Sequence, residues 1–220
     1  MGSIQKYALH GFLGSASDLS HGVDLFAYAR PSSGFDTWAK EFNRKTSEVK
    51  DKMLIGYSLG GRLALHALME QPSNWKSALF LSTHYGLETE EERCGRHAAD
   101  LFWSQIIERG EWSHFLSAWN AQAVFSGSRV TCQNDEVKRR ALWAEAMRYW
   151  SLGMQRSFLK ELHSLDIPWF YVVGARDLAA VERSKQLPQS NVKIIPDAGH
   201  RVHLDQPEII GEIYDKLENS

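Results

Sequence analysis

The sequence predicts an α/β fold, in which a mostly parallel sheet is flanked by helices and carries an inserted helical cap. Over residues 1–83, short apolar stretches alternate with amphipathic helical stretches, which is typical of a parallel sheet wrapped by helices. From about residue 84 to 165 there is no convincing strand pattern, and this is too long for one crossover. The strand pattern resumes over residues 166–220. We therefore predict a single domain over residues 1–220, with its core at 1–83 and 166–220 and its cap at about 84–165.

The predicted strands are short apolar stretches that end in turn residues. The first strand runs into a loop that contains Gly11 and Gly14, and the second precedes a loop with Pro31. The third and fourth strands have the composition of buried strands, whereas the last two end at Gly174 and before Pro196. In chain order, the predicted strands cover residues 4–9, 23–28, 53–57, 78–82, 168–174 and 192–195.

The predicted core helices follow these strands. Trp38, Phe42 and Val49 stand on one face of a helix, and the helix after the third strand stops near Pro72. Core helices are predicted over residues 35–49, 59–69 and 179–186, and a final amphipathic helix opens at residues 206–210.

Four further helices are predicted in the cap. The second of them carries Trp112, Phe115, Leu116 and Trp119 at positions i, i+3, i+4 and i+7, which gives it an apolar face. A helical block of this kind would cover the carboxyl edge of the sheet, where ligands bind in open α/β folds. The four helices are predicted over residues 88–109, 111–123, 136–150 and 155–162.

Composition excludes several classes of partner. The formal net charge of the 220 residues is -2 and both signs are mixed along the chain, so we expect no nucleic-acid partner. No apolar run is long enough to span a membrane, and the first residues lack the apolar core of a signal peptide. The two cysteines, Cys94 and Cys132, have no metal-type spacing and favour a reducing compartment. We therefore expect a cytoplasmic protein without a membrane partner.

Gly56-x-Ser58-x-Gly60 is the pattern of a nucleophile elbow, and here it lies between a predicted strand and a predicted helix. A serine on such a sharp turn has a strained backbone, and side chains larger than those of glycine would clash on either side. The turn presents the hydroxyl at a helix N-terminus, which favours negative charge. The pentapeptide alone is a weak signal, but its strand-to-helix context favours Ser58 as a catalytic residue.

Asp177 and His200 supply the other two groups of a charge relay. A serine hydroxyl needs a histidine to take its proton, and a carboxylate should orient that histidine. Both residues follow predicted strands, as Ser58 does, so a parallel sheet would gather all three at one edge. Asp177 could alternatively cap the next helix, and His203 is a nearby competitor for the role of His200.

An anion-stabilising pocket requires two backbone N–H donors. One should belong to Leu59, the residue after the candidate nucleophile. Phe12, in the loop after the first strand, is placed to supply the other. The alternative for this loop is an ordinary turn at the end of a strand.

These motifs resemble those of the α/β-hydrolase superfamily, so an α/β-hydrolase fold is expected. Within it, the chain is most similar to the 2-succinyl-6-hydroxy-2,4-cyclohexadiene-1-carboxylate synthase family. Four segments carry that resemblance: the first loop, the elbow with its tyrosine and arginine, the first cap helix and a later cap segment. They lie at residues 10–15, 56–62, 91–100 and 115–125.

The resemblance implies a lyase in which the triad serine, prepared by its histidine, removes a proton from a cyclohexene substrate. Pyruvate then leaves as its enol and a cyclohexadiene remains. No cofactor or metal is implied. The substrate is a small polycarboxylate, so an arginine-rich pocket is expected, and the chain is expected to act as a monomer or homodimer.

Arg62 is the first candidate for binding a substrate carboxylate. It lies one turn after Ser58 on the same helix face. A cation in the first turn opposes the helix dipole at a cost of ~0.3–1 kcal/mol, and an anion within reach of Arg62 would offset that cost. Arg96 on the first cap helix is a second candidate, with Arg93 as its rival. A surface ion pair is the alternative for each.

The resemblance suggests further substrate contacts. Trp119 could line the pocket or only pack the cap, and Tyr57 could donate a hydrogen bond or be buried packing. A third arginine is expected on the next cap segment, where Arg139 and Arg140 are candidates and Arg140 is favoured.

The chain also departs from the family pattern. Ala123 replaces a proline, and Leu178-Ala179 replaces a lysine and an aromatic residue that usually follow the aspartate. These departures affect the expected substrate contacts and leave the relay intact. Two alternatives remain open: a small serine carboxylesterase, such as a pimeloyl-carrier methyl ester esterase, and a ligand-binding relative without turnover. A pair of arginines favours the lyase, because a neutral ester needs no such pair.

Overall fold

The core is a six-stranded sheet in which every described strand pairing is parallel. The computed structural model describes residues 4–129 and 134–218, and Cys132 lies outside them. The strand order is β2-β1-β3-β4-β5-β6. The strands are β1 (Gln5–Leu9), β2 (Gly22–Val23), β3 (Lys52–Tyr57), β4 (Ser77–Leu81), β5 (Trp169–Gly174) and β6 (Val192–Ile195).

The register of the strands brings their carboxyl ends to one edge. Tyr57, the last residue of β3, pairs with Leu81, the last residue of β4. Gly174 at the end of β5 pairs with Ile195 at the end of β6. The segments that follow β3, β5 and β6 therefore begin along the same edge of the sheet, and they include Ser58.

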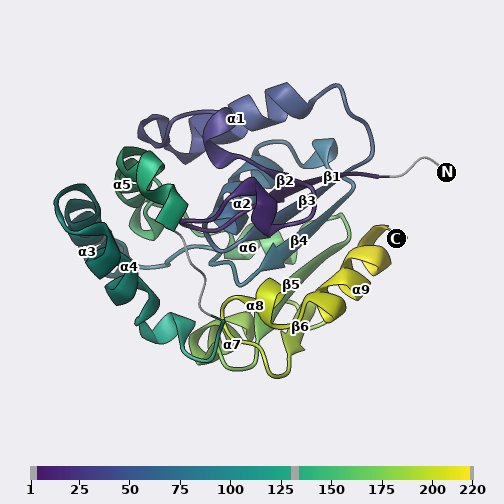
Figure 1. The fold of residues 1–220 in the computed structure, drawn as a ribbon. Coiled ribbons are helices and arrows are strands. Elements are labelled where there is room, and N and C mark those ends of the chain that lie inside the picture. The colour runs from purple at the N-terminus through teal and green to yellow at the C-terminus, as the bar shows by residue number, and fades with distance from the viewer. Residues whose placement is uncertain (1–3, 130–133, 219–220) are drawn as a thin grey trace.

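Helices cover both faces of the sheet (Figure 1). Helices α1 (Gly34–Thr46) and α2 (Leu59–Glu70) pack on one face, and α8 (Val202–Asp205) and α9 (Pro207–Glu218) lie against the other. Side chains of neighbouring strand residues alternate between two apolar clusters, which explains why the central strands are apolar at nearly every position.

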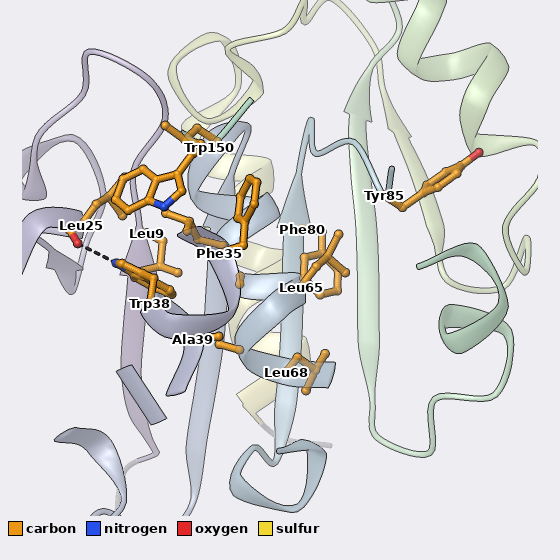
Figure 2. Close-up of a cluster of buried hydrophobic side chains, with 14 of the residues drawn as sticks. Leu9, Leu25, Phe35, Trp38, Ala39, Leu65, Leu68, Phe80, Tyr85 and Trp150 are labelled. Carbon is orange, nitrogen blue, oxygen red and sulfur yellow. Dashed lines mark hydrogen bonds between the residues drawn. The ribbon is translucent and has the colours of Figure 1, made fainter. Parts of the chain in front are cut away.

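The larger cluster joins the sheet to α1 and α2 and is rich in aromatic rings (Figure 2). The Trp38 ring stacks on Phe42, and its Nε1 donates a hydrogen bond to the Leu25 carbonyl at 2.7 Å. This bond satisfies the one polar atom of a fully buried side chain.

Between β4 and β5, the described residues form helices and no strand. They are α3 (Glu90–Arg109), α4 (Trp112–Asn120), α5 (Arg140–Tyr149) and α6 (Leu159–His163). Helices α3, α4 and α5 stand beside the carboxyl edge of the sheet (Figure 1). The Ser104 hydroxyl of α3 donates to the Ala144 carbonyl of α5 at 2.8 Å, which fixes the two helices together.

Several predicted elements are shorter than expected. The strand predicted over residues 23–28 is wrong beyond Val23, because the Asp24 side chain accepts from the Phe26 N–H and starts a one-turn 3₁₀ helix. Two cap helices begin later than predicted, at Arg140 and Leu159. No helix in the described part of the chain is long and apolar enough to cross a membrane.

Candidate active site

Ser58 occupies the sharp turn between β3 and α2 in a strained conformation. Its φ is 50° and its ψ is -111°, in a region that residues other than glycine rarely adopt. The flanking glycines permit the turn: a Cβ on Gly60 would lie 2.1 Å from the Leu9 carbonyl oxygen, and one on Gly56 would lie 2.4 Å from the Gly61 Cα. The G-x-S-x-G pattern therefore reflects close backbone packing around Ser58.

The structure brings together the three predicted relay residues. The His200 Nε2 lies 3.1 Å from the Ser58 Oγ, and the His200 Nδ1 lies 2.7 Å from the Asp177 Oδ2. The other carboxylate oxygen of Asp177 accepts from the Ala180 N–H at 3.1 Å, at the start of α7 (Leu178–Ser184). Asp177 thus does both things that the sequence suggested, because one oxygen caps a helix and the other holds the histidine.

Asp177 is placed to remain ionised. Burial favours its neutral form, but the hydrogen bond and charge of His200 and the Ala180 N–H outweigh burial and hold the pKa of the carboxyl below its usual range. A charged carboxylate here fixes the orientation of the His200 ring and stabilises the ring when it takes up a proton.

His203 is not the relay histidine. Its ring packs on the Tyr57 ring at 4.2 Å, and burial lowers its pKa to about 4. The same packing corrects the expectation for Tyr57, whose side chain is buried next to Gly11 and lies outside the cavity lining. Tyr57 supports the histidine loop from behind, where a substrate in the cavity would not contact it.

Ser58 and His200 open into a cavity of about 900 Å³ between the sheet edge and the cap. Phe12, Leu59 and Ser58 all line it, and the role of Phe12 and Leu59 in an anion-stabilising pocket stays a prediction. Leu59 is the first residue of α2, so its N–H has no acceptor within the helix. Trp119 also lines the cavity, and its ring packs on Phe12 at 4.8 Å, so it both lines the pocket and packs the cap.

Arg62 and Arg96 both line this cavity. The Arg62 Nη1 donates to the Trp150 carbonyl at 2.7 Å, and the Arg96 Nε donates to the Asp100 Oδ1 at 2.9 Å. Burial and the charge of Arg96 lower the pKa of Arg62 to about 9, with Asp100 acting against them, so its guanidinium is still charged at neutral pH.

The remaining candidate arginines lie elsewhere. Arg93 pairs with Glu90 at 2.7 Å, so the cavity is lined by Arg96 and not by its rival. The expectation for Arg140 is wrong, because its guanidinium donates to the carbonyls of Ile107 and Gly110 at the end of α3. Carbonyls at the end of a helix receive no hydrogen bond from within the helix, and the helix dipole attracts a cation to them.

Arg139 does not replace it, since its guanidinium pairs with Asp24 outside the cavity lining. Arg183 on α7 and His84 after β4 are among the lining residues that were not predicted from the sequence. The sequence does contain a signal for Arg183. It lies one helical turn after Ala179 in the helix predicted to follow Asp177, so both residues should share one helix face. Among residues 4–129 and 134–218, no group of three or more His, Cys, Asp and Glu side chains could hold a metal ion.

A family model described as "Alpha/beta hydrolase family" matches residues 8–212. The chain belongs to this family. The position of the serine elbow, the order of the three relay residues along the chain and the parallel sheet agree with the assignment.

Curated relatives of this α/β hydrolase carry the name 2-succinyl-6-hydroxy-2,4-cyclohexadiene-1-carboxylate synthase. The protein of that name from Yersinia enterocolitica is 29% identical over 90% of this chain and 81% of its own length. The one from Klebsiella pneumoniae is 28% identical over 71% of this chain and 64% of its own length. The chain thus spans slightly less than two thirds of the length of some of the curated relatives it matches.

A solved structure of MenH from S. aureus has the same fold. It superimposes with a TM-score of 0.84 at 19% identity and covers 100% of this chain and 96% of its own.

Proposed function

We propose that this α/β hydrolase is a carbon–oxygen lyase that eliminates pyruvate from 2-succinyl-5-enolpyruvyl-6-hydroxy-3-cyclohexene-1-carboxylate. The product would be 2-succinyl-6-hydroxy-2,4-cyclohexadiene-1-carboxylate, an intermediate of menaquinone biosynthesis. The names of the curated relatives support this choice of substrate. The observation that carries it is that the Ser58–His200–Asp177 relay opens into a cavity lined by arginines.

In the proposed reaction, Ser58 acts as a base and not as a nucleophile. His200 takes the Ser58 proton, and the resulting alkoxide removes a proton from the substrate ring. The electrons of the ring C2–H bond form a C2=C3 double bond, those of the existing C3=C4 bond move to C4=C5, and the C5–O bond to the enolpyruvyl group breaks. His200 then protonates the departing enolate, which becomes pyruvate, and Ser58 keeps the proton that it removed from the ring.

The neighbouring groups support these steps. Asp177 stabilises the His200 imidazolium while it holds the proton. The N–H groups of Phe12 and Leu59 are assigned to an oxygen that gains negative charge as the ring proton leaves. Arg62 and Arg96 are assigned to the substrate carboxylates, because a guanidinium can bind a carboxylate through two hydrogen bonds.

A small serine carboxylesterase, for example of the pimeloyl-carrier methyl ester esterase type, is the second candidate. The relay itself favours it, because the same three groups serve acyl transfer. We assign no nucleic-acid or membrane partner, and a cytoplasmic monomer or homodimer remains part of the proposal.

The test compares the two reactions on one enzyme preparation. The enol-pyruvyl substrate is mixed with the protein and pyruvate release is followed, beside hydrolysis of a p-nitrophenyl ester. We expect pyruvate release, and Ser58→Ala should reduce it by about 10³-fold or more. Ester hydrolysis without pyruvate release would reject the lyase in favour of the esterase. Unchanged activity in Ser58→Ala would remove Ser58 from both mechanisms.

A further inference from the structure

The cavity has a third cationic residue, Arg183, which belongs neither to the relay nor to the cap. Arg183 lies on α7, the helix that Asp177 caps, and it lines the cavity together with Ala179. The two positions are four residues apart, so they share one helix face. Since Ala179 has only a methyl group, that face of α7 leaves room for a ligand beside Arg183.

The hydrogen bonds of Arg183 differ from those of the other two lining arginines. Its Nε is buried and has no hydrogen-bond partner in the described part of the chain. No described carboxylate lies within 4.0 Å of its guanidinium, whereas Arg96 pairs with Asp100. The Arg183 guanidinium lies near the Tyr171 hydroxyl and Asp177, because its charge acts on the pKa of both groups. Arg183 therefore still has an unused donor.

His84 also lines the cavity, and of the charges that act on its ring that of Arg183 is the largest, so it offers a second donor near Arg183. Its Nδ1 accepts a hydrogen bond from the Gly86 N–H at 3.1 Å, so the proton of the neutral ring is on Nε2. Burial and the charges of Arg183, Arg62 and Arg96 lower its pKa to about 2, which keeps the ring neutral. A neutral N–H donor beside a guanidinium suits a carboxylate.

We propose that Arg183 and His84 form a carboxylate-binding subsite at the core side of the cavity. The identity of the ligand rests on the proposed function, because the substrate given there has three carboxylates: one on the ring, one on the succinyl group and one on the enolpyruvyl group. Arg62, Arg96 and Arg183 supply one guanidinium for each. The third cation thus comes from core helix α7, and not from the cap segment that contains Arg140.

The test measures binding without turnover, by calorimetric titration. Two stable anions together carry all three kinds of carboxylate: 2-(3-carboxypropanoyl)benzoate and 2-methoxyprop-2-enoate. Arg183→Met should weaken one of them roughly 10- to 100-fold, the usual effect of losing a charged hydrogen bond in a closed site, and leave the other within about 2-fold. Lys185→Met is the matched control, because Lys185 directly follows the last residue of α7 and pairs with Glu182 at the surface.

His84→Asn isolates the second donor. The asparagine Oδ1 can still accept from the Gly86 N–H, but the Nε2–H is lost. This variant should weaken the same anion roughly 3- to 10-fold. If Arg183→Met does not fold, Arg183→Lys, which keeps the charge but lacks the planar fork, should weaken that anion by a similar factor.

The outcomes separate the subsite from the reaction. Equal weakening of both anions would indicate general damage and would overturn the proposal. Binding of both anions to Arg183→Met within about 2-fold of wild type would overturn it too, as would failure of both to bind the wild-type protein. An enzyme without pyruvate release but with Arg183-dependent binding of one anion would lose the proposed reaction and keep the subsite.

Discussion

The carboxyl edge of the sheet and the helices that cover it contribute to the same cavity in different ways. At the edge, Ser58, Asp177 and His200 each follow a strand within a few residues, and parallel register sets their separation. In the helical layer, Arg96 stands on a helix whose rotation and distance from the sheet depend on packing. At the edge, the sequence predicted the individual residues that come together. For the helical layer, it predicted helices that carry arginines but did not settle which arginines line the cavity.

One buried arginine joins the two regions. Arg201, directly after the relay histidine, donates to the Arg129 carbonyl at 2.9 Å and to the Asn120 Oδ1 at 2.5 Å, both on the cap side. Its guanidinium also lies 4.2 Å from the centre of the Phe125 ring, which packs edge-on against His200. The cap is therefore attached to the loop that holds the histidine.

The largest expected effect comes from changing the edge. Asp177→Asn should reduce pyruvate release about 10⁴-fold, because an amide can stabilise the wrong tautomer of His200 and cannot balance its charge. Asparagine is as good a helix cap as aspartate, so α7 and the melting temperature should be little changed. Single-turnover rates and thermal unfolding check both statements. If unfolding of Asp177→Asn accounts for its whole loss of activity, Asp177 stabilises the fold and has no part in the reaction.

A smaller effect is expected at the arginines, where Arg62 on core helix α2 can be compared with Arg140 on cap helix α5. Arg62→Met should raise KM for the enol-pyruvyl substrate roughly 10- to 100-fold and leave ester hydrolysis largely intact, because a charged contact to a carboxylate is lost. Arg140→Met should lower the melting temperature without changing KM, because Arg140 binds carbonyls at the end of α3. Steady-state kinetics and thermal unfolding decide between them. An equal rise in KM for both variants would show that position relative to the cavity does not matter.

The smallest effect concerns the support behind the edge. His203 is buried and its pKa is lowered to about 4, below the value near 6.5 of an unfolded chain. Between pH 6.5 and about 4 the unfolded state binds more protons, so the free energy of unfolding should fall as the pH is lowered through this window.

His203→Phe should remove the contribution of His203 to that fall, roughly 2–3 kcal/mol between pH 7 and pH 4.5. Urea denaturation at pH 7 and at pH 4.5 measures it. His163, on the surface near Gln186, offers a control position at which the same substitution should leave the pH slope unchanged. An unaltered slope in His203→Phe would mean that other buried groups, such as His66, cause the acid sensitivity.

Some sequence predictions failed where helices begin and which way they face. Arg93 and Arg96 are three residues apart on one helix, and both have the composition of a charged surface, yet only Arg96 lines the cavity. Arg140 was favoured from a resemblance, and the nearby carbonyls of α3 took its donors instead. The residues next to an arginine in the sequence do not determine whether its guanidinium binds an unpaired carbonyl or lines an open cavity.

By itself, the sequence determined the parallel sheet, the sharp turn at Ser58 and the positions of Ser58, Asp177 and His200 at one edge of the sheet. Those features depend on local rules: apolar strands, glycines at close approaches and functional residues directly after strand ends. Only the tertiary structure decided that Tyr57 lies behind the site, that Arg140 caps a helix, and that Arg183 and His84 line the cavity. The physical reason is that a side chain's direction on a helix becomes meaningful only after the helix has packed, and packing depends on residues distant in the chain.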